Sequence, residues 1–125
     1  MPTSAPILTA LVIDDVSENR RIFSVALKKL GFGVIEAENG KIGLEMLQEN
    51  QVAVIFLDYE MPYMNGFEFL TAQKVTLKKD IPVIMISTST SCNIQAVEHY
   101  SAKKWIHKPP LSYELEDALI TIGVL

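Results

Sequence analysis

The sequence predicts an α/β domain in which a parallel β-sheet of five strands is covered by helices on both faces. Short apolar segments alternate with helix-like segments five times along 125 residues. Two of the apolar segments, 52–57 and 83–86, are unbroken, which is typical of strands buried on both faces. Such alternation calls for parallel strands joined by crossover helices, the three-layer, doubly wound arrangement. The length suits one domain and leaves little room for a second.

The first half of the chain holds three predicted strands and two predicted helices. We expect the strands at 10–13, 34–35 and 52–57, and the helices at 17–30 and 40–48. Ser17 can cap the first helix and Gly31 can end it. The dipeptide Asn39-Gly40 marks a turn before the second helix. Apolar residues recur at the spacing of one helical face in the first helix, at Phe23, Ala26, Leu27 and Leu30.

The second half continues the alternation with weaker signals. We expect helices at 67–75 and 94–100, strands at 83–86 and 105–107, and a final helix from Leu111. In the first of these helices, Phe67 and Leu70 are expected to point inward. The helix at 94–100 should be short, because the Ser/Thr-rich residues before it compete for backbone hydrogen bonds. The final helix is expected to place one apolar face inward, formed by Leu111, Leu115, Ala118, Leu119 and Ile122.

Composition and charge exclude several classes of protein. Eleven basic and fifteen acidic residues leave a net charge of −4, whereas a surface that binds nucleic acid is normally basic. The single cysteine, Cys92, excludes an internal disulfide and a cysteine-based zinc site. No apolar run reaches the length of a bilayer span. We therefore expect a cytoplasmic protein without membrane or direct nucleic-acid partners.

Polar residues stand at the ends of four predicted strands. They are Asp14 and Asp15 after the first strand, Asp58 after the third, Ser87 after the fourth and Lys108 after the fifth. In open α/β sheets, ligands bind beyond the carboxyl ends of the strands. Any one of these residues has a simpler explanation, such as helix capping by an aspartate or a solvated lysine in a loop. Their combination favours a shared site.

The residue types suit binding of a metal ion and a phosphoryl group. Three carboxylates at one edge repel one another, and a divalent cation removes the conflict. Hard oxygen ligands, few in number, suit Mg²⁺. Lys108 adds a second positive charge and the Ser87 hydroxyl can donate a hydrogen bond. Together these groups would hold phosphoryl oxygens, with a carboxylate as a possible nucleophile. Asp58 ends a buried strand and therefore needs a partner.

These motifs resemble the receiver domain of two-component response regulators, of the stand-alone chemotaxis-regulator type. The matching segments are Ile13-Asp14-Asp15, Asp58-Tyr59-Glu60-Met61-Pro62 with Asn65-Gly66, Val83–Ser87 and Lys108-Pro109. The resemblance implies one receiver domain over 1–125, with its core at about 8–123. It also implies a flavodoxin-like fold with strand order 2-1-3-4-5.

The resemblance assigns a phosphoacceptor and a metal site. Asp58 matches the phosphoacceptor. Asp15 matches the residue that contacts Mg²⁺ directly, whereas Asp14 usually acts through water. Asp58 itself and the backbone carbonyl of Glu60 complete the metal ligands, and Mn²⁺ is a possible substitute for Mg²⁺. The metal ion expected at this site is therefore Mg²⁺, or Mn²⁺ in its place.

The resemblance also assigns the groups that bind the phosphoryl group and report on it. Ser87 turns toward the phosphoryl group, Lys108 pairs with it, and the backbone of Thr88 binds it. Trp105 occupies the aromatic switch position. The output face then comprises the fourth helix, the last strand and the last helix, and its downstream protein partner is unknown.

The expected function is transfer of a phosphoryl group from a histidine kinase or histidine phosphotransfer protein to Asp58. The chain is then no enzyme beyond autophosphorylation from small donors and autodephosphorylation. An Mg²⁺-dependent phosphohydrolase is an alternative, although Glu60 stands where such enzymes carry a second aspartate. A flavodoxin-like cofactor binder is another, although Asp14-Asp15 would repel phosphate. The third is a docking module that acts without phosphorylation. The receiver is either a stand-alone protein or part of a larger regulator or hybrid kinase.

Overall fold

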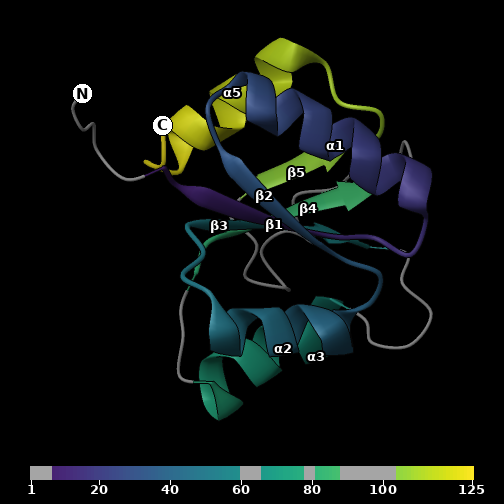
Figure 1. The fold of residues 1–125 in the computed structure, drawn as a ribbon, viewed down its shortest axis with the longest axis vertical. Coiled ribbons are helices and arrows are strands. Elements are labelled where there is room, and N and C mark those ends of the chain that lie inside the picture. The colour runs from purple at the N-terminus through teal and green to yellow at the C-terminus, as the bar shows by residue number, and fades with distance from the viewer. Residues whose placement is uncertain (1–6, 60–65, 78–80, 88–103) are drawn as a thin grey trace.

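The computed structural model contains a five-stranded parallel sheet between two helical layers (Figure 1). It describes residues 7–59, 66–77, 81–87 and 104–125. The strands are β1 (Thr9–Ile13), β2 (Gly33–Ala37), β3 (Val54–Asp58), β4 (Val83–Ser87) and β5 (Lys104–His107). All neighbouring strands pair in parallel, in the order β2-β1-β3-β4-β5. The predicted fold class and strand order are confirmed.

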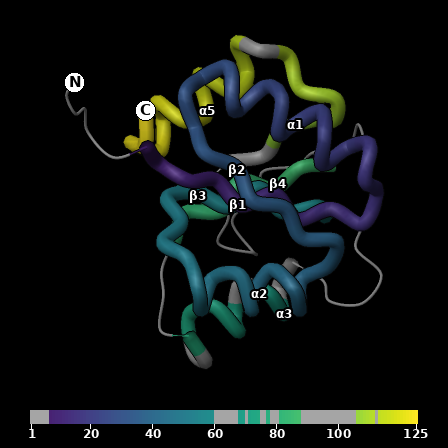
Figure 2. Tube along the Cα trace, viewed as in Figure 1, coloured from purple at the N-terminus to yellow at the C-terminus, as the bar shows by residue number. Residues whose placement is uncertain are grey.

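Helices cover both faces of this sheet. They are α1 (Ser17–Lys29), α2 (Gly40–Glu49), α3 (Gly66–Thr71) and α5 (Ser112–Thr121), and a π-helical turn, η1 (Ala72–Thr76), continues α3. The pair α1 and α5 covers one face, and the pair α2 and α3 covers the other (Figures 1 and 2). None of the helices in the described ranges has the length and apolar character that a membrane span requires. The helix expected at 94–100 lies outside the described residues.

The first helix, α1, begins at Ser17 as expected, but its cap differs from the sequence-based expectation. Ser17 is the first residue of the helix and not its cap, and the N-cap position belongs to Val16, in an extended conformation. The reason is a local hydrogen bond: the Asp14 carboxylate accepts the backbone N–H of Val16 over 2.9 Å. This bond turns the chain into the helix, which begins at Ser17. An aspartate of the predicted site therefore also organises the helix that follows it.

The end of α1 is the glycine stop that the sequence predicted. Gly31 has φ of 95°, a left-handed conformation that residues with a side chain rarely adopt. Its N–H bonds to the carbonyl of Lys28, and the N–H of Phe32 bonds to that of Leu27. This hydrogen-bond pair is the Schellman motif, and it turns the chain directly into β2.

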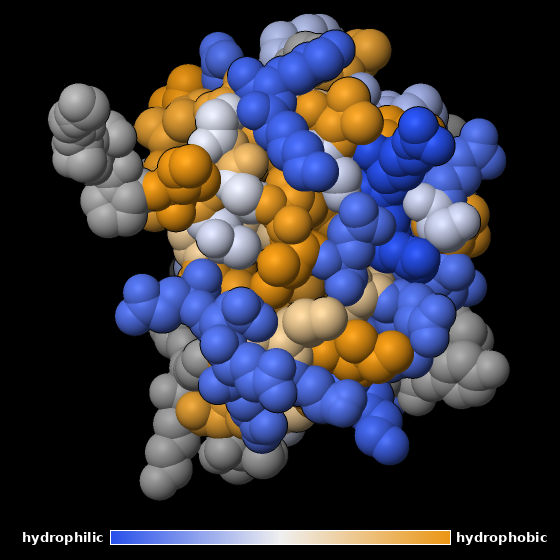
Figure 3. Space-filling model, in the orientation of Figure 1, coloured by the Kyte–Doolittle hydropathy of each residue, from blue (hydrophilic) through white to orange (hydrophobic). Residues whose placement is uncertain are grey.

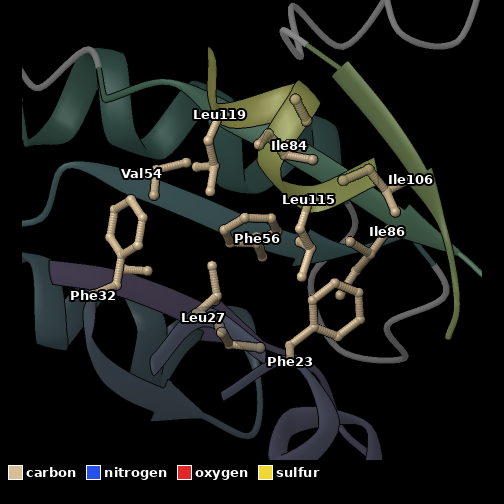
Figure 4. Close-up of a cluster of buried hydrophobic side chains, with 13 residues drawn as sticks. Phe23, Leu27, Phe32, Val54, Phe56, Ile84, Ile86, Ile106, Leu115 and Leu119 are labelled. Carbon is tan, nitrogen blue, oxygen red and sulfur yellow. The ribbon is translucent and has the colours of Figure 1, made fainter. Parts of the chain in front are cut away.

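The core consists of two buried apolar clusters, one on each face of the sheet. The cluster under α1 and α5 contains Ala10, Val12, Phe23, Leu27, Phe32, Val54, Phe56, Ile84, Ile86, Ile106, Leu115, Ala118 and Leu119 (Figure 4). The cluster under α2 and α3 contains Leu11, Ile13, Ala37, Leu47, Ile55, Leu57, Phe69, Val83 and Met85. Successive residues of β1, β3 and β4 alternate between the clusters, as the pleat of a strand requires.

The buried face of the last helix also differs from expectation. Leu111 precedes α5 and is 54% exposed, so it does not join the buried face that Leu115 and Ala118 form. Its N–H instead donates to the Glu114 carboxylate, an interaction that fixes the start of the helix. In the segment α3–η1 the structure buries Phe69 and Gln73. The side chains of Phe67 and Leu70, which were expected to point inward, lie outside the described part of the chain.

The edge strand β2 is only partly covered. Val34 and Ile35 are partly buried, and Glu36 is exposed. In Figure 3, hydrophobic side chains lie at the upper left and centre of the visible face, with hydrophilic side chains among them and below them. Strand β2 crosses the centre of this view in Figure 1.

Replacing Gly43 with Ala is expected to lower the free energy of unfolding by about 1 kcal/mol. A Cβ at this position in α2 would lie 2.5 Å from Ile13 Cδ1 and 3.3 Å from a ring carbon of Phe69, both buried. Overpacking a core costs about 1–3 kcal/mol, which outweighs the gain of about 1 kcal/mol from alanine's helix propensity. Urea denaturation of the two proteins measures the difference.

The double variant Gly43→Ala/Ile13→Val is the control for this contact. Valine lacks the Cδ1 atom, so the new methyl group fills the vacated space. We expect the double variant to be more stable than the sum of the single effects by at least about 1 kcal/mol. Strictly additive losses would show that Ile13 Cδ1 is not the obstacle.

Candidate functional site

The carboxyl edge of the sheet brings the predicted polar residues together. Asp14 follows β1, Asp58 and Ser87 end β3 and β4, and Lys108 follows β5. These four side chains are buried, with exposures between 0% and 5%, whereas Asp15 is exposed. Buried charged and polar groups are costly unless they are paired, so their concentration at one edge requires mutual compensation.

Backbone hydrogen bonds extend the sheet past the strand ends and fix the site. Asp58 pairs in register with Ile86 of β4. The N–H of Tyr59 donates to the carbonyl of Ile86 over 2.9 Å, and the N–H of Lys108 donates to that of Ser87 over 2.7 Å. The loops after β3 and β5 therefore begin at fixed positions, and the peptide bond between Lys108 and Pro109 is cis.

Lys108 links the two buried carboxylates of the site. Its Nζ donates to Asp14 Oδ2 over 2.8 Å and to Asp58 Oδ1 over 3.1 Å. These partners lie 94 and 50 residues away in the sequence. One ammonium group thus compensates two aspartates from different strands, and it lies between the groups that the sequence predicted as metal ligands.

The surroundings of Lys108 keep its side chain charged. Burial alone lowers the pKa of the ammonium, because a charge is less stable away from water. The hydrogen bond to Asp14 and the negative charge of Asp58 act in the opposite direction and outweigh burial, so the pKa lies above its ordinary value. Lys108 is therefore a fixed positive charge at neutral pH.

Asp14 is hydrogen-bonded at all four of its polar groups. One carboxylate oxygen accepts the Val16 N–H and the other accepts Lys108 Nζ. Its backbone N–H donates to the carbonyl of Ala37 over 3.1 Å, and its own carbonyl accepts Arg20 Nη1 over 2.6 Å. Its position is thus held by β2, α1 and the loop after β5.

Sequence reasoning missed Arg20. A signal for it was present, because a cation in the opening turn of a helix is unfavourable with the helix dipole. A basic residue there needs a specific partner, and the structure supplies two. These are the Asp14 carbonyl and the carboxylate of Glu36 in β2, which is 3.3 Å from Arg20 Nε.

The acidic cluster has the donor chemistry of a magnesium site. Asp14, Asp15 and Asp58 each offer one carboxylate oxygen, and these three oxygens lie within 4.8 Å of one another. Two oxygens on one Mg²⁺ are at most about 4.2 Å apart, so small side-chain movements would suffice. Three carboxylates against the single ammonium of Lys108 leave two negative charges, which one divalent cation neutralises. The cluster is compatible with Mg²⁺.

Three predicted site residues have functional groups that lie outside the described part of the chain. Glu60 and Thr88 lie outside the described residues. The backbone of Trp105 belongs to β5 and pairs with Met85 of β4, but its side chain is outside the described part. The metal-ligand carbonyl, the phosphoryl-binding backbone and the aromatic switch therefore remain predictions.

Comparison with known proteins identifies the class that this fold and site define. The family model of the response regulator receiver domain matches residues 10–120. The chain belongs to this family. Within it, the chain is a CheY-like receiver domain of two-component signalling, as the relatives below indicate.

Relatives in sequence and in structure support this placement. The chain is 35% identical over 119 residues to a chemotaxis protein CheY homologue of Campylobacter jejuni, with 89% of this chain and 92% of the relative covered. It is 39% identical over 83 residues, 65% of this chain, to the protein-glutamate methylesterase/protein-glutamine glutaminase of Treponema pallidum, of which it spans only 20%.

A solved structure with the same architecture is chemotaxis protein CheY4 of Vibrio cholerae. The TM-score is 0.82 at 31% identity, and the match covers 92% of this chain and 98% of that one. The response regulator TrrA of Thermotoga maritima, solved in complex with Mg²⁺ and BeF, has a TM-score of 0.80 at 23% identity and covers 93% of this chain and 99% of its own. At that identity the likeness shows the fold alone.

Proposed function

We propose that the chain accepts a phosphoryl group on Asp58 from a histidine kinase or a histidine phosphotransfer protein. The observation that carries the proposal is the pair of bonds from Lys108 Nζ to Asp14 and Asp58. These bonds place a fixed positive charge 3.1 Å from a carboxylate oxygen of Asp58. A phosphoryl group on that carboxylate would bring its negative oxygens next to the ammonium. Membership of the receiver family supports the same assignment.

The proposed transfer forms one bond and breaks another. An oxygen of the Asp58 carboxylate attacks phosphorus, and the bond between phosphorus and the donor's imidazole nitrogen breaks. The imidazole takes a proton as it leaves, and Asp58 becomes an acyl phosphate. Lys108 stabilises the added negative charge, and the Ser87 hydroxyl donates a hydrogen bond to a phosphoryl oxygen. Positioning and electrostatics account for most of the rate in reactions of this class.

Asp14, Asp15, Asp58 and the backbone carbonyl of Glu60 would hold Mg²⁺ or Mn²⁺ beside the phosphoryl group. A bound divalent ion supplies positive charge that offsets the charge on the phosphoryl oxygens. Asp15, which is exposed, would contact the ion directly, and Asp14 would contact it through a water molecule. This division is supported by the hydrogen bonds that both Asp14 carboxylate oxygens already accept, from the Val16 N–H and from Lys108 Nζ.

Phosphorylation would then change the affinity for a downstream protein partner. Ser87 and Lys108 move toward the phosphoryl group, the backbone of Thr88 binds it, and Trp105 repacks. The change is a shift in the populations of two states rather than a new fold. The partner binds through the face that includes β5 and α5, and no direct contact with nucleic acid or membrane is part of the proposal. Apart from autophosphorylation and autodephosphorylation, the receiver catalyses no reaction.

Incubation with Mg²⁺ and acetyl phosphate tests the phosphoacceptor. We expect the intact mass of the wild type to increase by a single phosphoryl group, and the mass of Asp58→Asn to stay unchanged. Asp117→Asn, which removes an exposed carboxylate from α5, is the matched control and should be phosphorylated like the wild type.

Other outcomes point to the alternatives. An adduct that persists on Asp58→Asn would place the phosphoacceptor elsewhere. A wild type that binds Mg²⁺ but takes no phosphoryl group from acetyl phosphate or from a phosphorylated histidine donor would indicate a docking module. Steady turnover of small phosphate esters would indicate a phosphohydrolase.

A further inference from the structure

A hydrogen-bond network outside the acidic site connects α1, the end of β1 and the edge strand β2. Arg20 Nη1 donates to the Asp14 carbonyl over 2.6 Å, and Arg20 Nε donates to Glu36 Oε1 over 3.3 Å. Ser24 Oγ donates to the other carboxylate oxygen, Glu36 Oε2, over 3.0 Å. Arg20 therefore joins three elements through a single guanidinium group.

The carbonyl that Arg20 holds belongs to the peptide bond between Asp14 and Asp15. A peptide unit is planar, so fixing its oxygen fixes the direction in which the chain leaves Asp14 and enters Asp15. The two residues on either side of this peptide bond differ in burial, because Asp14 is buried and Asp15 is exposed. Asp14 and Asp15 must both lie near one ion to bind it. The bond from Arg20 to the backbone carbonyl therefore affects how this acidic pair is arranged.

The guanidinium is itself held in place. Ser24 is 3% exposed, and the side chain of Arg20 is only 15% exposed. Glu36 uses both carboxylate oxygens within the network, one toward Arg20 and one toward Ser24. The planar fork of arginine suits two acceptors at once, whereas lysine offers a single nitrogen.

We propose that Arg20 is a positioning residue of the phosphorylation site: it holds the Asp14–Asp15 peptide in the orientation that metal binding requires, with Glu36, which Ser24 holds, holding Arg20. This inference rests on the proposed function. Arg20 acts through the backbone and touches none of the reacting atoms. Partners that orient metal ligands in this way typically change metal affinity by about 10–100-fold when they are removed.

Charge and geometry predict opposite effects of removing Arg20. Loss of a positive charge near the acidic cluster strengthens the attraction for a cation, whereas loss of the carbonyl contact weakens the site. Arg21 is the matched control, because it is the next residue of α1 and is exposed. Arg21→Ala removes the same charge, and the described structure gives Arg21 no contact with the Asp14 carbonyl.

The experiment measures Mg²⁺ affinity of the unphosphorylated full chain by calorimetry. We expect Arg20→Ala to bind Mg²⁺ about 10-fold more weakly than Arg21→Ala. The variant Arg20→Ala/Glu36→Ala leaves the net charge unchanged. It should bind Mg²⁺ more weakly than the wild type by a similar factor. Arg20→Lys should fall between the wild type and Arg20→Ala, because its ammonium reaches one acceptor and not both.

Each result decides the inference. Equal Mg²⁺ affinities for Arg20→Ala and Arg21→Ala overturn it, even where Arg20→Ala is the less stable protein, because stability alone would show only a structural role. If Arg20→Ala does not fold, Arg20→Lys decides, since it keeps the charge: an affinity equal to that of the wild type overturns the proposal. A wild type that binds no Mg²⁺ would instead overturn the proposed metal site, and the inference with it.

Discussion

Lys108→Met is expected to lower the free energy of unfolding by about 3 kcal/mol in the absence of divalent ions. The substitution keeps the apolar stem and removes the ammonium that bonds to Asp14 and Asp58. Both carboxylates are at least 98% buried, so they would be left close together without a compensating cation. Breaking a buried ion pair from one side is costly because the remaining charge keeps its desolvation penalty.

Urea denaturation at pH 7 measures this effect, first with EDTA and then with Mg²⁺. We expect Mg²⁺ to restore part of the lost stability and to bind more tightly to Lys108→Met than to the wild type, because the ammonium no longer competes for the carboxylates. Lys41→Met, which removes an exposed ammonium in α2, is the control and should change stability by less than about 0.5 kcal/mol. Equal stability of the Lys108 variant and the control would contradict the role of the buried ammonium.

The pH dependence of this effect follows from the raised pKa of Lys108. A group whose pKa is raised by folding stabilises the folded state fully below its unfolded pKa, which is about 10.4 for lysine. That contribution is lost as the pH rises through the higher folded value. The part of the stability difference between the wild type and Lys108→Met that comes from the Lys108 charge should therefore become smaller only under strongly alkaline conditions.

Phe56→Ala is expected to lower the free energy of unfolding by about 4 kcal/mol. Phe56 lies on the central strand β3, is fully buried, and points into the cluster between the sheet and the helices α1 and α5 (Figure 4). Its ring centroid is 5.8 Å from that of Phe23, with the rings tilted by 43°. Truncation removes this contact and leaves a cavity among side chains from both helices.

Such a loss is a large part of the 5–15 kcal/mol by which domains are typically stable. With a urea dependence of about 1–3 kcal/mol per molar, the midpoint should fall by more than about 1 M. Tyr113→Ala is the matched control, because Tyr113 is an aromatic residue that is 70% exposed on α5. A midpoint shift for Phe56→Ala no larger than that for Tyr113→Ala would contradict the packing of this cluster.

Much of the fold was predictable because its signals are local. Unbroken apolar runs predicted β3 and β4. Gly31 predicted the end of α1, because glycine readily adopts the left-handed conformation found there. Alternation predicted parallel strands, but the strand order came only from the resemblance to receiver domains. The errors concern helix starts. Ser17 was expected to cap the first helix, and Leu111 was expected to lie on the inward face of the last one. Instead, the carboxylates of Asp14 and Glu114 form the hydrogen bonds at the starts of α1 and α5.

The residues of the site were predictable for a related reason. Strand ends are visible in a sequence, and parallel strands bring their carboxyl ends to one edge, so Asp14, Asp58, Ser87 and Lys108 could be grouped before any geometry was known. Their burial follows from the same position. The chemistry of the group, one cation beside several acids, could be inferred from the residue types alone.

The sequence by itself determined which residues end the strands and what chemistry they carry. Only the tertiary structure decided how those residues are paired. Lys108 bonds to carboxylates 94 and 50 residues away, and nothing local to any of the three residues encodes that choice. Arg20 bonds to a backbone carbonyl, an acceptor that every residue of the chain offers, so its partner is selected by the packing of α1 against β1 and β2. Periodicity and residue type are local properties, whereas a specific contact depends on positions that the whole fold sets.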